Sequence, residues 1–175
     1  MGVLTRGFQG RRDSDPDLPP GQYLTHDFPV LSAGPTPAIA LDEWSFTFTA
    51  ETGARRTWDW DQFMQRPGEG RTVDLHCVTR WSKLGTTWRG VSLDVLLGDV
   101  DTEADYAMVQ CYGGYNTNLP LEDLLDGQSW LVHEYEGEPL APVHGGPARL
   151  LVPQLVDRLV LRATVPVMLV PTCER

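Results

Sequence analysis

The sequence predicts a strand-rich α+β domain with mixed sheets, because short alternating segments are separated by connections that contain glycine and proline. The chain has 175 residues, of which 41% are hydrophobic and 22% are charged. This length suits one domain, and it can bury a core without disulfides or a structural metal. Helix signals are few and short, so strands are expected to dominate the architecture.

The first 40 residues are predicted to form an extended arm, and residues 41–175 the body of the domain. Proline removes a backbone donor and disfavours helix at the residue before it. The arm carries six prolines: Pro16, Pro19, Pro20, Pro29, Pro35 and Pro37. Its apolar residues, Tyr23 and Phe28 among them, would let it dock onto the core.

The body alternates between predicted strands and a few short helices. Alternating or short apolar runs bounded by turn residues are typical of strands. They predict strands at 44–48, 57–60, 71–78, 106–112, 130–135, 148–152 and 165–170. A helical turn is expected at 61–65. Ser92 is a suitable N-cap for a helix that ends at Leu97, and Pro120 suits the first turn of a helix over 120–125.

The net charge of −10 argues against several functional classes. Basic runs do not exceed two residues, so nucleic-acid binding is not expected, and an anionic ligand would depend on a few local arginines. No apolar run approaches the roughly 20 residues of a membrane span. Residues 1–12 lack the apolar core of a signal peptide, which predicts a cytoplasmic protein.

Cys77 stands at the end of a predicted strand, before the polar loop 78–82. The cysteines are odd in number and widely spaced, so a disulfide framework is not expected. Taken alone, Cys77 is most simply a buried core cysteine. A zinc site made with His76 and His144 lacks paired ligand spacing, and a Cys–His hydrolase lacks a recognised nucleophile signature. These interpretations stay open on the residues alone.

A second segment combines two glycines with an arginine. His144 is followed by Gly145 and Gly146, which permit a tight turn or the close approach of a ligand. Arg149 then opens a predicted strand, from which a guanidinium could hold a phosphate through two hydrogen bonds. Taken alone, such a segment is more often a turn followed by a surface arginine.

Three segments in this order resemble the sulfite oxidase family of molybdopterin enzymes and its small bacterial sulfite-oxidase-like members. They are FPVLSAGPTP at 28–37, LHCVTRW at 75–81 and HGGPARLLVP at 144–153. WRGV at 88–91 and GYNTNLPL at 114–121 extend the resemblance, which covers roughly residues 20–153. It implies a mixed α+β molybdopterin-binding domain.

The resemblance also implies a role for Cys77, which would give its thiolate to molybdenum beside the dithiolene and oxo groups of the molybdenum–molybdopterin cofactor. Soft sulfur donation of this kind requires the deprotonated cysteine. His144 and Arg149 would contact the pterin, with Arg149 toward its phosphate. Phe28 would help the N-terminal arm close over the cofactor.

The activity implied by the resemblance is two-electron oxygen-atom transfer. Arg80 and Trp81 would line the pocket for a small-molecule oxo donor or acceptor. No haem-binding segment is evident, so a separate electron-transfer partner is expected. Leu31 and Ala33 stand where sulfite-oxidising members carry an arginine and a histidine, so sulfite is not the expected substrate.

The resemblance ends after Pro153, and no lysine follows Lys83. Relatives continue with a lysine-containing segment that grips the pterin phosphate. Residues 154–175 are therefore predicted to be divergent, and a shifted reading frame is one hypothesis for the change. The alternative function is a non-catalytic remnant that keeps the fold without retaining the cofactor.

Overall fold

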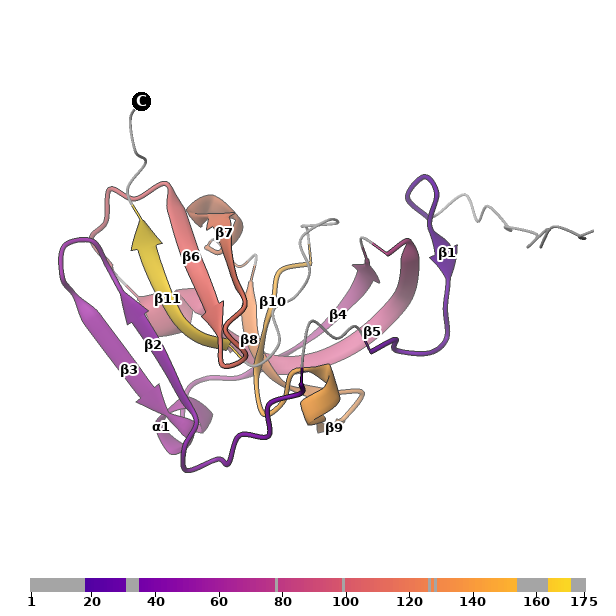
Figure 1. Cartoon of the computed structure of the whole chain (residues 1–175), viewed down its shortest axis with the longest axis horizontal. Helices are drawn as coiled ribbons and strands as arrows, with labels where there is room; N and C mark the ends of the chain where they lie inside the picture. The colour runs from indigo at the N-terminus through magenta and orange to yellow at the C-terminus, as the bar shows by residue number, and fades with distance from the viewer. Residues whose placement is uncertain are drawn as a thin grey trace, which may run out of the picture.

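The computed structural model describes residues 18–30, 35–77, 79–98, 100–125, 127, 129–153 and, as backbone only, 164–170. The strands form two sheets, with short helices at the strand ends (Figure 1). Parallel and antiparallel pairs occur in both sheets. The predicted strand-rich α+β fold with mixed sheets is therefore confirmed.

The first sheet is organised around the long strand β5 (Trp81–Ser92). β5 pairs antiparallel with β4 (Glu69–His76) and with β8 (Trp130–Tyr135), and its first residues pair in parallel with β1 (Tyr23–Leu24). β8 continues the sheet to β10 (Arg149–Leu151), and a short strand, β9 (Glu138–Pro139), also pairs with it. Figure 1 shows β4 and β5 curving away from the second sheet, with β1 beside the start of β5.

The second sheet has the order β3-β2-β11-β6-β7. Its strands are β2 (Ser45–Thr49), β3 (Arg55–Asp59), β6 (Tyr106–Cys111), β7 (Asn116–Pro120) and β11 (Thr164–Val170). β11 lies between β2, to which it is parallel, and β6, to which it is antiparallel. The predicted C-terminal strand thus joins the middle of this sheet, although residues 154–163 and 171–175, with Cys173, lie outside the described residues.

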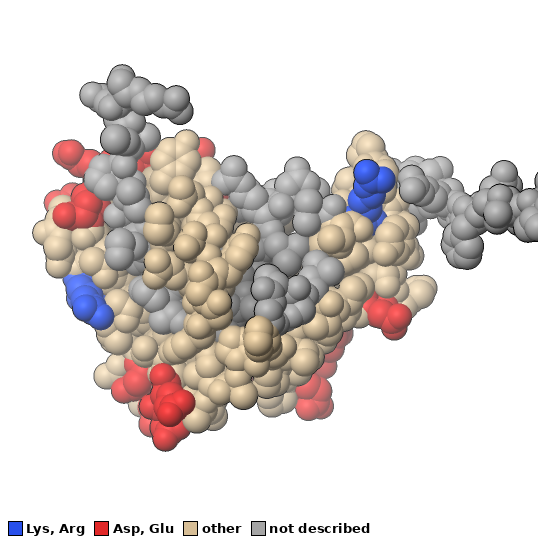
Figure 2. Space-filling model, in the orientation of Figure 1, with Lys and Arg blue, Asp and Glu red and all other residues tan. Residues whose placement is uncertain are grey.

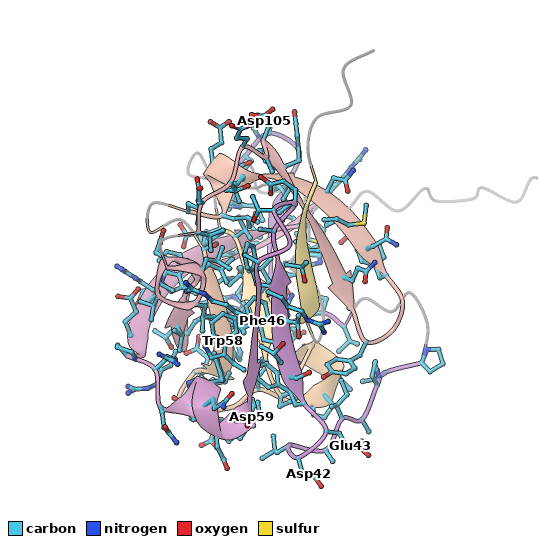
Figure 3. The ribbon with its side chains drawn as sticks, turned by 90° about the vertical axis from the view of Figure 1, so that its left-hand side faces the viewer. Asp42, Glu43, Phe46, Trp58, Asp59 and Asp105 are labelled. Atoms are coloured by element: carbon cyan, nitrogen blue, oxygen red, sulfur yellow. The ribbon has the colours of Figure 1, made fainter. Side chains whose placement is uncertain are left out.

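The main core receives side chains from both sheets. Phe46 on β2 and Trp58 on β3 lie side by side with ring centroids 5.6 Å apart (Figure 3). The first sheet contributes Val91, Leu131 and Leu150 to the same cluster. Burying large side chains of this kind contributes roughly 1.5–3 kcal/mol each, so this core is the main source of the fold's stability.

Two of the predicted helices form, and their starts are fixed by capping. α1 (Trp60–Met64) begins at Asp59, whose carboxylate accepts a hydrogen bond from the Gln62 N–H, while the Gln62 side chain accepts one from the Asp59 N–H. This capping box places Trp60 in a helix, so the prediction of a strand through residue 60 is wrong. α2 (Leu93–Leu97) begins at Ser92, as predicted.

The predicted helix over 120–125 is reduced to a 3₁₀ turn, η1 (Leu121–Asp123). Pro120 ends strand β7, where it pairs with Tyr106, instead of opening a helix. The extended backbone that suits a residue at a helix start also suits the end of a strand, and the sheet decides between the two. None of the described helices is long and apolar enough to cross a membrane.

Gly90 lies where the backbone of β5 comes close to that of β8, so a substitution there tests how far the fold depends on this approach. A Cβ at this position would lie 2.3 Å from the carbonyl oxygen of Leu131 and 2.5 Å from Cα of Val132. Gly90→Ala is therefore expected to destabilise the fold by about 1–3 kcal/mol, because backbone atoms cannot yield as side chains do. Gly70→Ala on β4 is the matched control, because its Cβ would lie 3.9 Å from the Trp88 carbonyl oxygen, an ordinary van der Waals distance. Urea unfolding of both variants checks this; equal midpoints would contradict it.

His133 makes stability depend on pH. Burial lowers the pKa of His133; the negative charge of Glu134 opposes this shift and the positive charge of Arg89 adds to it. The buried surroundings include Trp60 and Phe63, whose rings make T-shaped contacts with the His133 ring. The unfolded chain therefore takes up more protons, and stability should fall as pH drops below the unfolded value of about 6.5. The urea concentration at the unfolding midpoint should fall between neutral pH and mild acid in wild-type protein, and it should fall less in His133→Gln. An unchanged loss would show that His133 does not cause it.

Candidate active site

The first sheet carries a second buried cluster on the face opposite the main core, here called the aromatic cluster. It consists of Leu75, Cys77, Trp81, Trp88, Trp130, Val132, Leu140 and Leu151, with Phe28, Val73 and Tyr135 packed against it. Neighbours along a strand point to opposite faces. On β10, for example, Leu150 enters the main core while Leu151 enters the aromatic cluster. The sheet is thus apolar on both faces, and Cys77 lies on the second one.

Cys77 sits at the first position of the tight turn that joins β4 to β5. Its N–H donates to the carbonyl of Trp81 at 2.8 Å, and its own carbonyl accepts from the Arg80 N–H at 2.8 Å. Arg80 adopts a left-handed backbone with φ of 71°, which is uncommon outside glycine. These bonds hold the backbone of Cys77 at the edge of the sheet, and its side chain is only 1% exposed.

The sulfur of Cys77 has Thr79 as its neighbour. Thr79 Oγ1 lies 3.0 Å from Cys77 Sγ, and the Thr79 N–H donates to the same sulfur at 3.5 Å. Neither of these two hydrogen bonds involves a histidine, the residue that the hydrolase alternative would use as a base beside the thiol.

The two histidines of the zinc alternative contact other side chains. His76 Nδ1 is hydrogen-bonded to Ser82 Oγ at 2.8 Å, and the His144 ring is stacked on Phe28. No group of three His, Cys, Asp or Glu side chains able to hold a metal ion lies within the part of the chain that the structure describes. A single cysteine sulfur such as that of Cys77 suits a metal that arrives with other ligands of its own.

The N-terminal arm is fastened to the Cys77 turn by its backbone and by Gln22. Gln22 Nε2 donates to the Cys77 carbonyl at 3.1 Å, and Gln22 Oε1 accepts from Ser82 Oγ at 3.2 Å. The N–H groups of Tyr23 and Thr25 donate to the carbonyls of Arg80 and Ser82, both at 2.9 Å. The arm therefore fixes the position of the turn that carries the sulfur.

Phe28 brings the arm into contact with the third predicted segment. Its ring stacks on His144 with centroids 4.1 Å apart and an interplanar angle of 4°. The guanidinium carbon of Arg149 lies 5.8 Å from the ring centroids of both Phe28 and Trp88, and Arg149 Nη1 donates to the His144 carbonyl at 2.6 Å. The structure thus brings Phe28, His144 and Arg149 into contact with one another.

The other predicted site residues divide into buried and exposed positions. Cys77 and Trp81 are buried members of the aromatic cluster, against which Phe28 packs. Arg80 is exposed in the turn beside them. Leu31 and Ala33 lie outside the described residues.

Sequence reasoning missed Gln22 and Thr79. Thr79 is within the cysteine segment, where its position two residues after Cys77 was an available signal. Gln22 lies in an arm whose sequence carries no pattern that indicates its partner, because both of its hydrogen bonds span more than fifty residues.

Arg149 is an unusual cation for this acidic chain, because its side chain is only 5% exposed. It also bears on Cys111, where burial raises the pKa of the thiol to about 11 and the positive charge of Arg149 opposes the rise. Elsewhere, acidic side chains stand out at the margins of the face shown in Figure 2, and basic ones are sparse there. Arg149 is therefore the buried positive charge that could stabilise an anionic group near the aromatic cluster.

Two buried polar atoms bear on whether a ligand fits at the aromatic cluster. Trp81 Nε1 and Tyr135 Oη are shielded from water and have no hydrogen-bond partner among the described residues. Buried polar atoms nearly always have a partner, since an unmet one costs about 1–3 kcal/mol. Both atoms therefore fit a polar ligand. With the sulfur of Cys77 and the cation of Arg149, the residues suit an anionic, metal-bearing group.

Comparison with known proteins agrees with this chemistry. Residues 33–159 match the family described as the oxidoreductase molybdopterin binding domain. The chain is 35% identical over 153 residues to the uncharacterized oxidoreductase YuiH of Bacillus subtilis (strain 168), covering 85% of this chain and 77% of YuiH. It is 25% identical over 185 residues to an NADH nitrate reductase of Lotus japonicus, covering 82% of this chain and 20% of that enzyme.

A solved structure with the same fold is the sulfane dehydrogenase SoxCD from Paracoccus pantotrophus. The two superpose with a TM-score of 0.67 at 16% sequence identity. The match covers 77% of this chain but only 40% of the SoxCD chain, so it concerns the fold of one part of that protein.

The contact between Phe28 and His144 can be tested by its effect on stability. Phe28→Ala removes the stacked ring and is expected to destabilise the fold by about 2 kcal/mol, less than a fully buried phenylalanine because the ring is half-buried. Tyr23→Ala is the matched control, because Tyr23 is in the same arm but 48% exposed. Urea unfolding of both variants measures the difference. A Phe28 variant no less stable than the Tyr23 variant would show that the stack does not anchor the arm.

Proposed function

The chain belongs to the oxidoreductase molybdopterin-binding domain family, and we propose that it is a molybdenum enzyme that catalyses two-electron oxygen-atom transfer. The observation that carries the proposal is the position of Cys77, a buried cysteine held in a hydrogen-bonded turn, in a cluster where two buried polar atoms have no partner among the residues that the structure describes. When bound, the molybdenum–molybdopterin cofactor would supply the redox chemistry, and the protein would supply orientation and charge.

In this proposal, Cys77 gives the protein's thiolate to molybdenum. The hydrogen bonds of Gln22 and Arg80 to the Cys77 carbonyl hold that residue in place, so the sulfur needs little reorganisation to bind a metal. Trp81 and Tyr135 would direct their buried polar atoms toward the cofactor.

His144 and Arg149 would contact the pterin, with the Arg149 guanidinium toward its phosphate. Arg149 already has its position fixed by the His144 carbonyl and by the rings of Phe28 and Trp88. A charge-assisted hydrogen bond to a phosphate would contribute about 1.5–3 kcal/mol. Phe28 links these residues to the N-terminal arm, which supports the proposal that the arm closes over the cofactor.

Arg80 and Trp81 would line the substrate pocket for a small oxo donor or acceptor. Arg80 is exposed in the turn that begins at Cys77 and is the arginine of that turn. One cation suits a neutral or weakly charged substrate better than sulfite, a dianion. A separate electron-transfer partner and a cytoplasmic location complete the proposal.

Metal analysis of protein expressed in a host that makes molybdopterin tests this function. The wild-type chain is expected to purify with stoichiometric molybdenum, and Cys77→Ser with little, because a hydroxyl is a poor replacement for a thiolate. Cys111→Ser is the matched control, since Cys111 lies on β6 of the other sheet and should leave the metal content unchanged.

Two results would overturn the proposal. Wild-type protein without molybdenum would identify the chain as a remnant that keeps the fold without its cofactor. Full molybdenum content in the Cys77 variant would show that the thiolate does not hold the metal.

A further inference from the structure

We propose that Thr79 is a positioning residue that sets the electron donation of the Cys77 sulfur to the metal. This inference rests on the proposed function, because it assumes that Cys77 binds molybdenum. It adds a residue that acts on the metal through the sulfur, without contacting the cofactor itself.

The geometry gives Thr79 two donors directed at one sulfur. Its hydroxyl oxygen lies 3.0 Å from Cys77 Sγ, and its backbone N–H donates to Sγ at 3.5 Å. Between a thiol and a hydroxyl either atom can donate. A metal-bound thiolate has no proton, so the Thr79 hydroxyl must then be the donor.

The hydroxyl of Thr79 is not needed to build the turn. The turn is already closed by the bond from the Cys77 N–H to the Trp81 carbonyl and by the bond from the Arg80 N–H to the Cys77 carbonyl. Gln22 adds a third bond to the same carbonyl. A purely structural role for the hydroxyl would duplicate these constraints.

The surroundings make a hydrogen bond to this sulfur effective. Cys77 is almost fully buried against Trp81 and other members of the aromatic cluster, so water has little access to Sγ, while Thr79 itself is exposed. Hydrogen bonds from outer residues tune metal centres, and those to ligating sulfurs help to set reduction potentials. Donation to the thiolate withdraws electron density from it and favours the reduced metal.

Three variants separate this role from a structural one. Thr79→Val keeps the branched shape but removes the hydroxyl, Thr79→Ser keeps the hydroxyl, and Thr79→Ala also lacks it and serves if the valine variant does not fold. Each is purified with its cofactor, and its molybdenum content is measured. The reduction potential is then determined by redox titration monitored by electron paramagnetic resonance.

The expected result is full molybdenum content in all variants. The reduction potential should shift to lower values in Thr79→Val and Thr79→Ala, while Thr79→Ser stays close to wild type. Potentials equal to wild type in the valine and alanine variants would overturn the role of Thr79 while leaving the proposed function intact. Wild-type protein without molybdenum would instead overturn the proposed function, and the role of Thr79 with it.

Discussion

The first sheet is buried on both faces at β8 and β10, and the position of the candidate site follows from this constraint. Successive residues of β8 and β10 enter opposite clusters, so a shift of one residue in register would exchange the main core with the aromatic cluster. Gly90 allows β5 to approach β8 closely enough to keep that register. The register of β4 with β5 directs Cys77 and Trp81 to the face that carries the aromatic cluster.

Strands with regular alternation or a continuous apolar run were predictable from the sequence. β2, β6 and β8 lie within a residue or so of their predicted bounds because their side chains reflect local burial. β5 was not predicted, because its residues 83–87 are mostly polar and its existence depends on pairing with β4. Trp60 and Pro120 were assigned wrongly, since a capping box and a strand pairing decide their conformations.

The residues that gather at the candidate site were predictable in part. The sequence singled out Cys77, His144 and Arg149, and the structure brings the last two into contact through a hydrogen bond. Gln22 and Thr79 could not be assigned a role, because hydrogen bonds to a distant carbonyl or to a neighbouring sulfur leave no periodic pattern. What a sequence reports well is which residue types could bind a ligand; how they are oriented depends on tertiary contacts.

We propose that Cys77 is the residue through which the protein holds the metal. X-ray absorption at the molybdenum edge tests it most directly, because it counts the sulfur atoms bound to the metal. The wild-type protein should show one sulfur atom more at the metal than the dithiolene of the cofactor supplies by itself. A sulfur count explained by the dithiolene alone would show that Cys77 is not a ligand.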